Sequence, residues 1–149
     1  MYFNQKNNFY HGIMFHHFHD GKKHLKGQGS ITKDEFYKIL NFIGIKNILN
    51  ADIFFEKSKN NKLKDNEVCI TFDDSVKCQI DIALPVLEDL KIKSFFFVYT
   101  SIFEGKPDYL ELFRHFRINY FENINEFYRE FYEILDEDLD NFFLKNQKI

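Results

Sequence analysis

The chain has 149 residues, enough for a single domain with a substantial core. Its formal net charge is -3 and its pI is about 6.1, which gives no electrostatic basis for binding nucleic acid or an anionic membrane. The sequence contains neither a signal-peptide pattern at its start nor an apolar run of transmembrane length. Cys69 and Cys78 do not form a disulfide framework, so we expect a cytoplasmic protein in a reducing compartment.

The first third of the chain predicts a strand, a polar loop and a helix. After a lead-in at residues 1–11, Gly12–Phe18 is expected to form the first strand. The loop at His19–Ser30 is too rich in glycine and lysine for packed structure. Apolar residues then recur at helical spacing after a capping hydroxyl, and this helix is expected to end at Gly44.

A polar loop separates these elements from the clearest strand in the chain. A short strand at Ile45–Leu49 and an apolar helix beginning at Ile53–Lys57 are predicted before the loop at Ser58–Asn66. In the next apolar run, Val68–Phe72, the side chains alternate between the two faces of a sheet. This strand stops at two neighbouring aspartates.

Asp73 and Asp74 lie where the predicted strand gives way to a helix, the position at which α/β enzymes present catalytic groups. Neighbouring carboxylates repel each other unless a cation lies between them or one keeps a proton. Alternatively, Asp74 or Ser75 caps the following helix, and no chemistry is implied. The pattern alone leaves both interpretations open.

The second half predicts one more buried strand and then helices. A helical stripe runs through Val76–Leu90, where Pro85 requires a kink or a helix start. The continuous apolar run Ile92–Tyr99 is typical of a strand buried on both faces of a parallel sheet. Strand, helix and strand together predict a βαβ unit. A short helix at Tyr109–Phe116 and a longer amphipathic helix over Ile124–Leu135 follow.

Histidines gather where the first strand is expected to end. His16, His17 and His19 lie there, and in a strand His17 and His19 point to the same face, so this H-x-H pair could ligate one metal. The alternative is a group of surface or core histidines that bind nothing. Parallel strands present their carboxyl ends at one edge, which favours a site shared with the aspartates.

The order of these motifs resembles the polysaccharide deacetylase domain (NodB-like, carbohydrate esterase family 4). The resemblance runs from about Gly12 to Phe103. Its segments are I-M-F-H-H-F (13–18), I-T-K-D-E-F (31–36), T-F-D-D (71–74), P-V-L-E-D-L-K-I (85–92) and S-F-F-F-V (94–98). It implies an α/β fold: a (β/α) barrel of parallel strands with flanking helices, present here as an incomplete barrel over residues 12–149 with a helical insertion at about 107–145.

The resemblance also implies a metal-dependent hydrolase that removes N-acetyl or similar acyl groups from a carbohydrate. Asp73 matches the general base of the family and Asp74 its aspartate metal ligand. The implied cofactor is a divalent metal, commonly zinc. His16 matches the histidine of the opening strand, and together with His17 and His19 it is a candidate to line the site.

Two features depart from the family. Ser75 replaces the glycine that usually follows the first motif and that allows a positive φ. The downstream H-S/T-x-x-H motif, which supplies two metal histidines, is missing: after His24 the chain has only His115, with Asn119 four residues later. We therefore expect the N-terminal portion of a domain, weakly active or inactive alone, that associates with itself or with a second half of the barrel.

Two other functions are open from the sequence. One is a carbohydrate-binding remnant without catalysis. The other is a metallohydrolase of another family in which the H-x-H pair, His17 and His19, replaces the missing histidines. A carbohydrate is the expected partner, and neither nucleic acid nor a membrane is expected.

Overall fold

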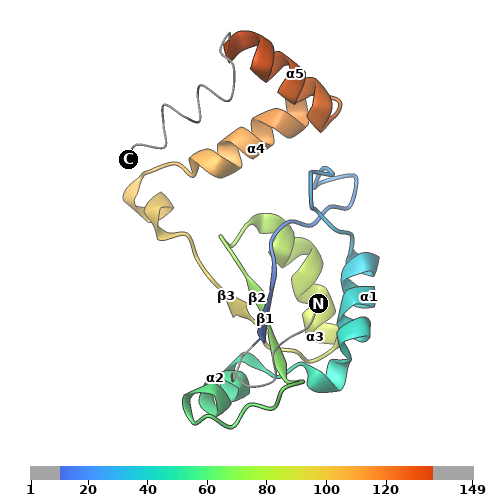
Figure 1. Cartoon of the computed structure of the whole chain (residues 1–149), viewed down its shortest axis with the longest axis vertical. Coiled ribbons are helices and arrows are strands. Elements are labelled where there is room, and N and C mark those ends of the chain that lie inside the picture. Colours follow the sequence, from blue (N-terminus) through green and yellow to red (C-terminus); the bar gives the residue numbers. More distant parts are fainter. Residues whose placement is uncertain (1–10, 136–149) are drawn as a thin grey trace. The chain divides into compact units, whose positions relative to one another are not determined.

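The computed structural model describes residues 11–135 (Figure 1). The chain divides into two compact units between Lys106 and Pro107. The first unit contains a three-stranded parallel sheet in the order β1–β2–β3 with helices beside it. The α/β class, the parallel strands and the flanking helices confirm the prediction, whereas the described strands form an open sheet and show no barrel.

The sheet is centred on β2 (Val68–Phe72), the strand that the alternating pattern predicted. β1 (His11–Phe15) lies parallel to it, with Phe15 opposite Phe72, and β3 (Phe95–Phe96) lies on its other side. Because β1 and β2 end at the same register position, the residues after each strand leave the sheet at the same edge.

Helix α1 (Lys33–Ile43) begins and ends as its sequence predicts. The Thr32 hydroxyl accepts the backbone N–H of Glu35 at 3.2 Å, and the Glu35 carboxylate accepts that of Thr32 at 2.7 Å, which together form a capping box. Gly44, at φ 87°, follows the last turn and donates its N–H to the carbonyls of Leu40 and Asn41. Helix α2 (Ala51–Lys59) contains Ile53–Lys57, the segment that the sequence predicted to be helical.

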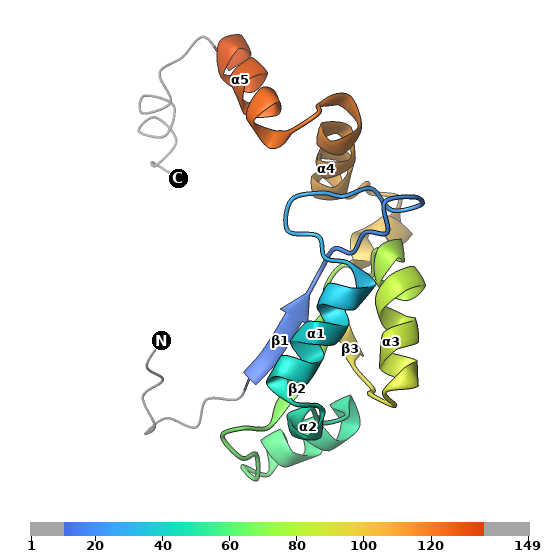
Figure 2. The same cartoon turned by 90° about the vertical axis from the view of Figure 1, so that its right-hand side faces the viewer.

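The core of the first unit lies between the sheet and two helical segments. Figure 2 shows α1 and α3 (Leu84–Asp89) over the sheet. Four phenylalanine rings fill this layer with centroids 4.8 to 6.4 Å apart: Phe15, Phe18, Phe36 and Phe72. Edge-on and tilted ring pairs of this kind add to the stability gained from burial. Met14, on the opposite face of β1, is 54 % exposed.

Pro85 has the effect that the sequence predicted. A π-helical turn, η2 (Gln79–Ala83), precedes α3, and the proline lies in the first turn of α3. Proline has no N–H to donate to the carbonyl four residues earlier, so the regular α-helical ladder cannot pass through this position.

One predicted strand is wrong, and another is much shorter than predicted. Ile45–Leu49 contains a 3₁₀ turn, η1 (Ile45–Asn47), and only Ile48 bridges to β2. The run Ile92–Tyr99 contributes only the two residues of β3 to the sheet, and Phe97–Tyr99 is exposed. β3 is an edge strand of the described sheet, so this apolar run lacks the second neighbour that would bury it. A 3₁₀ turn, η3 (Thr100–Glu104), follows.

The second unit contains two described helices, α4 (Tyr109–Tyr120) and α5 (Ile124–Leu135), as predicted. Asp108 accepts backbone N–H groups at the start of α4, and Asn123 does so at the start of α5. Phe127 is buried against Phe113 and Phe121, with ring centroids 5.3 and 5.2 Å away. Across the described residues, no helix combines the length and the apolar character needed to span a bilayer.

Candidate functional site

The ends of β1 and β2 bring a histidine and a carboxylate together. His16 follows β1, and Asp73 and Asp74 follow β2. The Nε2 atom of His16 lies 3.0 Å from Oδ2 of Asp74, and the two side chains are 24 % and 29 % exposed. This pair forms because the parallel register ends both strands at one edge of the sheet.

The turn after β2 has an uncommon backbone conformation. Asp74 has φ 62° and Ser75 has φ 50°, both in the left-handed region. Aspartate is enriched there several-fold over most residues, whereas serine has no such preference. The Ser75 hydroxyl donates to the carbonyl of Phe97 at 3.3 Å, which ties the turn to the chain after β3. The turn therefore keeps a glycine-like conformation although it contains no glycine.

The structure does not support the alternative in which Asp74 or Ser75 only caps the following helix. Among the described residues, the helical segment after the turn has no side-chain cap, and no backbone N–H group donates to Asp73, Asp74 or Ser75 side chains. Both aspartate side chains are partly exposed at the edge of the sheet. Their placement agrees with a site that opens to solvent.

Gln79 holds this edge together, and sequence reasoning missed it. Its side chain is fully buried, and Nε2 donates to the carbonyl of His16 at 2.9 Å and to that of Asp73 at 2.6 Å. One amide thus joins the residues that follow the two strands. The available signal was a single amide at an otherwise apolar helical position, where a buried polar group requires partners.

The three histidines after β1 lie in two different environments. The rings of His16 and His17 lie with centroids 4.3 Å apart. His19 is 9 % exposed, and its Nδ1 atom lies 3.0 Å from the Ser30 hydroxyl. It lines a pocket to which neither His16, His17 nor the aspartate doublet contributes. The structure therefore pairs His16 with Asp74 and places His19 beside a neighbouring cavity.

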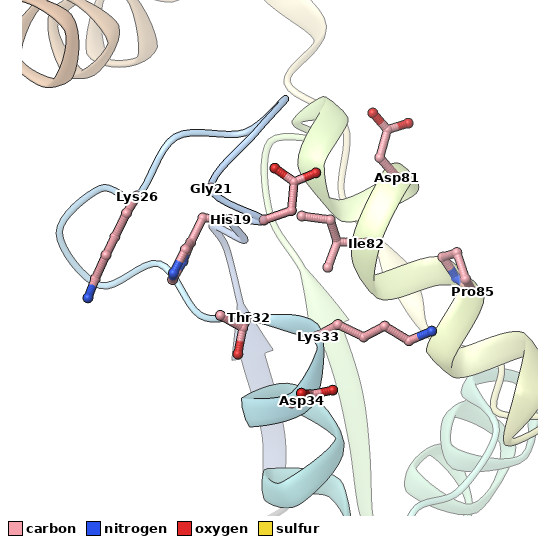
Figure 3. A pocket seen from close by; sticks show the side chains of 10 residues that line it. His19, Gly21, Lys26, Thr32, Lys33, Asp34, Asp81, Ile82 and Pro85 are labelled. Atoms are coloured by element: carbon pink, nitrogen blue, oxygen red, sulfur yellow. The ribbon is translucent and has the colours of Figure 1, made fainter.

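This pocket has a volume of about 690 Å³ and lies between the loop after β1, the first turn of α1 and the segment η2–α3 (Figure 3). His19 and Lys26 line it from the loop, Thr32 to Asp34 from the start of α1, and Asp81, Ile82 and Pro85 from the third wall. Its size falls in the usual range of ligand pockets, about 300–1,000 Å³.

The loop that forms one wall is more ordered than its composition predicted. The Oδ1 atom of Asp20 accepts three successive backbone N–H groups, those of residues 22–24, each at 2.9 Å. These hydrogen bonds stabilise the charged form and lower the pKa of Asp20. The Oδ2 atom of Asp81 lies 2.6 Å from Lys23 Nζ and 2.8 Å from His24 Nε2. Hydrogen bonds from Lys23 and His24 lower the pKa of Asp81 to about 2.

The donor atoms of the first unit fit a metal only in part. His16 and Asp74 offer an imidazole and a carboxylate, both of which bind zinc. Within Gly12–Lys106, however, no three histidine, cysteine or carboxylate ligand atoms lie within 4.8 Å of one another. A catalytic zinc site normally takes three protein ligands. The described part of this unit therefore supplies two ligands of the expected kinds and no complete set.

Fold and site together define an α/β protein with an aspartate doublet and a histidine at the carboxyl edge of a parallel sheet. Residues 60–123 match the polysaccharide deacetylase family. This confirms the resemblance seen in the motifs: the matched segment is part of a NodB-like polysaccharide deacetylase domain, and it covers less than half of the chain. It contains β2, the doublet, Gln79 and β3, whereas β1 and α1 lie before it. No curated protein and no solved structure matches the chain.

Proposed function

We propose that this chain acts in the metal-dependent removal of N-acetyl or similar acyl groups from a carbohydrate. The observation that carries the proposal is the 3.0 Å approach of His16 Nε2 to Asp74 Oδ2. The aspartate belongs to the segment that matches the deacetylase family, and the histidine comes from the neighbouring strand. A carboxylate and an imidazole at the carboxyl edge of parallel strands form a suitable start of a metal site.

The residues have separate roles in this proposal. Asp73 removes the proton of the attacking water, and Asp74 with His16 contributes ligands to the metal, of which zinc is the best candidate. A divalent metal, when bound, polarises the acyl carbonyl and makes a bound water more acidic. Gln79 fixes the spacing of these groups through the two carbonyls that it binds. The family resemblance supports the roles of the aspartates, and the geometry supports that of His16.

The organisation of the chain agrees with this proposal. We assign residues 12–149 to a barrel-type deacetylase domain with a helical insertion at about 107–145, supported by the parallel sheet and by the division after Lys106. Residues 136–149 lie outside the described part of the chain. Cys69 and Cys78 are both buried, which agrees with the proposed reducing, cytoplasmic environment.

The experiment measures zinc binding by calorimetry and acetate release from N,N′,N″-triacetylchitotriose with the full chain. We expect zinc to bind, with at least tenfold weaker binding in Asp74→Ala and unchanged binding in Asp89→Ala, an exposed aspartate of α3. Any acetate release should disappear in Asp73→Asn. An unchanged zinc affinity in Asp74→Ala would rule out Asp74 as a metal ligand.

The second candidate is a carbohydrate-binding protein without catalysis. It is favoured by the incomplete set of metal ligands within Gly12–Lys106. Binding of the trisaccharide without zinc affinity or acetate release would select it. The structure gives less support to the metallohydrolase in which His17 and His19 bind the metal. His19 Nδ1 already contacts the Ser30 hydroxyl. Within the first unit, no group of three nearby ligand atoms includes His17 and His19.

A further inference from the structure

We propose that two copies of this chain form a dimer through α4 and α5, the helices of the second unit (Figure 1). Self-association is one of the two partnerships that the sequence predicted, and the proposal is independent of the proposed function. The match to the deacetylase family ends at residue 123, and α5 begins at Ile124. The surface therefore includes a helix that the family match does not contain.

Helix α5 has a wide apolar face, most of which is exposed. Its apolar residues recur three or four positions apart, and its charged residues occupy the other side of the helix. Among the described side chains of α5, only Phe127 is buried, against Phe113 and Phe121. Beyond this contact, Tyr132 is 46 % and Ile134 is 82 % exposed. An apolar helix face of this kind is stable when another element covers it.

Helix α4 also presents aromatic rings to solvent. Tyr109, Phe113, Phe116 and Tyr120 recur at intervals of three or four residues, so they lie on one face of the helix, and all four are exposed. The ring of Phe116 packs against that of Tyr120, with centroids 5.0 Å apart. This contact within the helix leaves the outer surface of the rings open to a partner.

The second unit is too small to bury these faces by itself. Each of its two described helices has 12 residues, which gives a length of about 18 Å. Units of this size usually gain stability from disulfides, metals or oligomerisation. Both cysteines of the chain precede residue 107, so no disulfide can form within this unit. Two copies bring four helices around one core, as in a four-helix bundle.

The charges of the two helices favour a second copy as the partner. Helix α4 carries two arginines and one glutamate, whereas α5 carries three glutamates and one arginine. In a dimer with two-fold symmetry, α4 of each copy packs against α5 of the other, so this attraction occurs twice. The acidic side of α5 is unsuited to an anionic membrane, which amphipathic helices bind through lysine and arginine.

The test is sedimentation velocity of the full chain over a range of micromolar concentrations. We expect a species with twice the 18.1 kDa mass of one chain. Ile134→Glu places a charge on the exposed apolar face without removing a packed side chain, and should raise the dissociation constant about tenfold or more. The matched control is Phe42→Glu on α1, whose ring is 93 % exposed outside the second unit. This variant should dimerise like the unaltered chain.

A charge reversal tests the pairing of α4 with α5. Arg117 follows Phe116, and Glu130 precedes Phe131, so both charges border the apolar faces. Arg117→Glu should weaken the dimer about three- to tenfold, more strongly at low salt. The additional change Glu130→Arg should restore most of the affinity. A double variant as weak as Arg117→Glu alone would overturn the proposed pairing.

Three results would overturn the dimer itself. They are a full chain that stays monomeric, an Ile134→Glu variant that dimerises normally, and a dimer that Phe42→Glu weakens as much as Ile134→Glu does. For a monomeric chain, co-sedimentation with phosphatidylcholine vesicles would identify a lipid surface as the partner of α5. No binding to these vesicles would leave residues 136–149 of the same chain to cover the helix.

Discussion

His16 Nε2 lies 3.0 Å from Asp74 Oδ2, although the two residues follow different strands and are far apart in the sequence. If this pair binds zinc, removal of the imidazole should have a large effect on the metal and a small one on the fold. We predict that His16→Ala weakens zinc binding about 10- to 100-fold in calorimetry. The control is His115→Ala on α4, which should bind zinc normally; equal affinities in both variants would contradict the assignment.

Ser75 provides a test of the strained turn. A φ of 50° costs conformational energy in serine but not in glycine. The Ser75 hydroxyl makes only one long hydrogen bond, 3.3 Å, to the carbonyl of Phe97. We predict that Ser75→Gly raises the free energy of unfolding by about 0.5 kcal/mol in urea denaturation. Ser75→Val, with a branched β-carbon at positive φ, should lower it by about 1–2 kcal/mol. A more stable valine variant would show that the turn is not left-handed.

Gln79 should be the most sensitive polar residue of the first unit. Gln79→Leu keeps the volume roughly constant but leaves the carbonyls of His16 and Asp73 without their donor. We predict a loss of about 2–4 kcal/mol in the free energy of unfolding, measured by urea denaturation. The control, Gln28→Leu in the exposed part of the loop, should change stability by less than about 0.5 kcal/mol.

The ion pairs of Asp81 predict a specific dependence on pH. Its pKa in the folded chain is about 2, below the ordinary value of 3.8, so the folded state binds this proton less readily than the unfolded state does. The stabilisation by Asp81 is therefore complete above the ordinary pKa and is lost as the pH falls from 3.8 toward about 2.

Asp81→Asn removes this titrating group. We predict a lower melting temperature than that of the unaltered chain at about pH 6 and a much smaller difference at about pH 2.5. Hydrogen exchange at the amides of residues 22–24 should be faster in the variant at the higher pH. A difference in melting temperature that grows with acidity would refute the link between Asp81 and the loop.

The sequence was most informative where local chemistry decides the structure. The capping hydroxyl before α1, Gly44 at its end, the alternation in β2 and the position of Pro85 predicted elements that the structure contains. The end of the same alternating pattern also predicted that Asp73 and Asp74 follow β2. These features depend on a few neighbouring residues, so no knowledge of distant contacts was required.

Long-range partners explain what the sequence could not predict. The apolar run Ile92–Tyr99 has the composition of a buried strand, but burial depends on a neighbouring strand that the described sheet does not have beyond β3. The site predicted from the sequence was incomplete for the same reason. Gln79 acts through two backbone carbonyls, and His19 through the Ser30 hydroxyl, and such contacts leave no periodic signal in the sequence.

The π-helical turn at Gln79–Ala83 has a consequence for how this chain should be aligned with other proteins. A turn of this kind accommodates one residue more than an α-helical turn, and one residue corresponds to a rotation of about 100° around the helix axis. An alignment that treats the segment before Pro85 as uniform α-helix would shift Gln79 and Asp81 by one position relative to the residues that follow. Alignments that match residues by the direction in which they leave the helix axis, rather than by their number in the chain, will identify the true equivalents of Gln79 and Asp81.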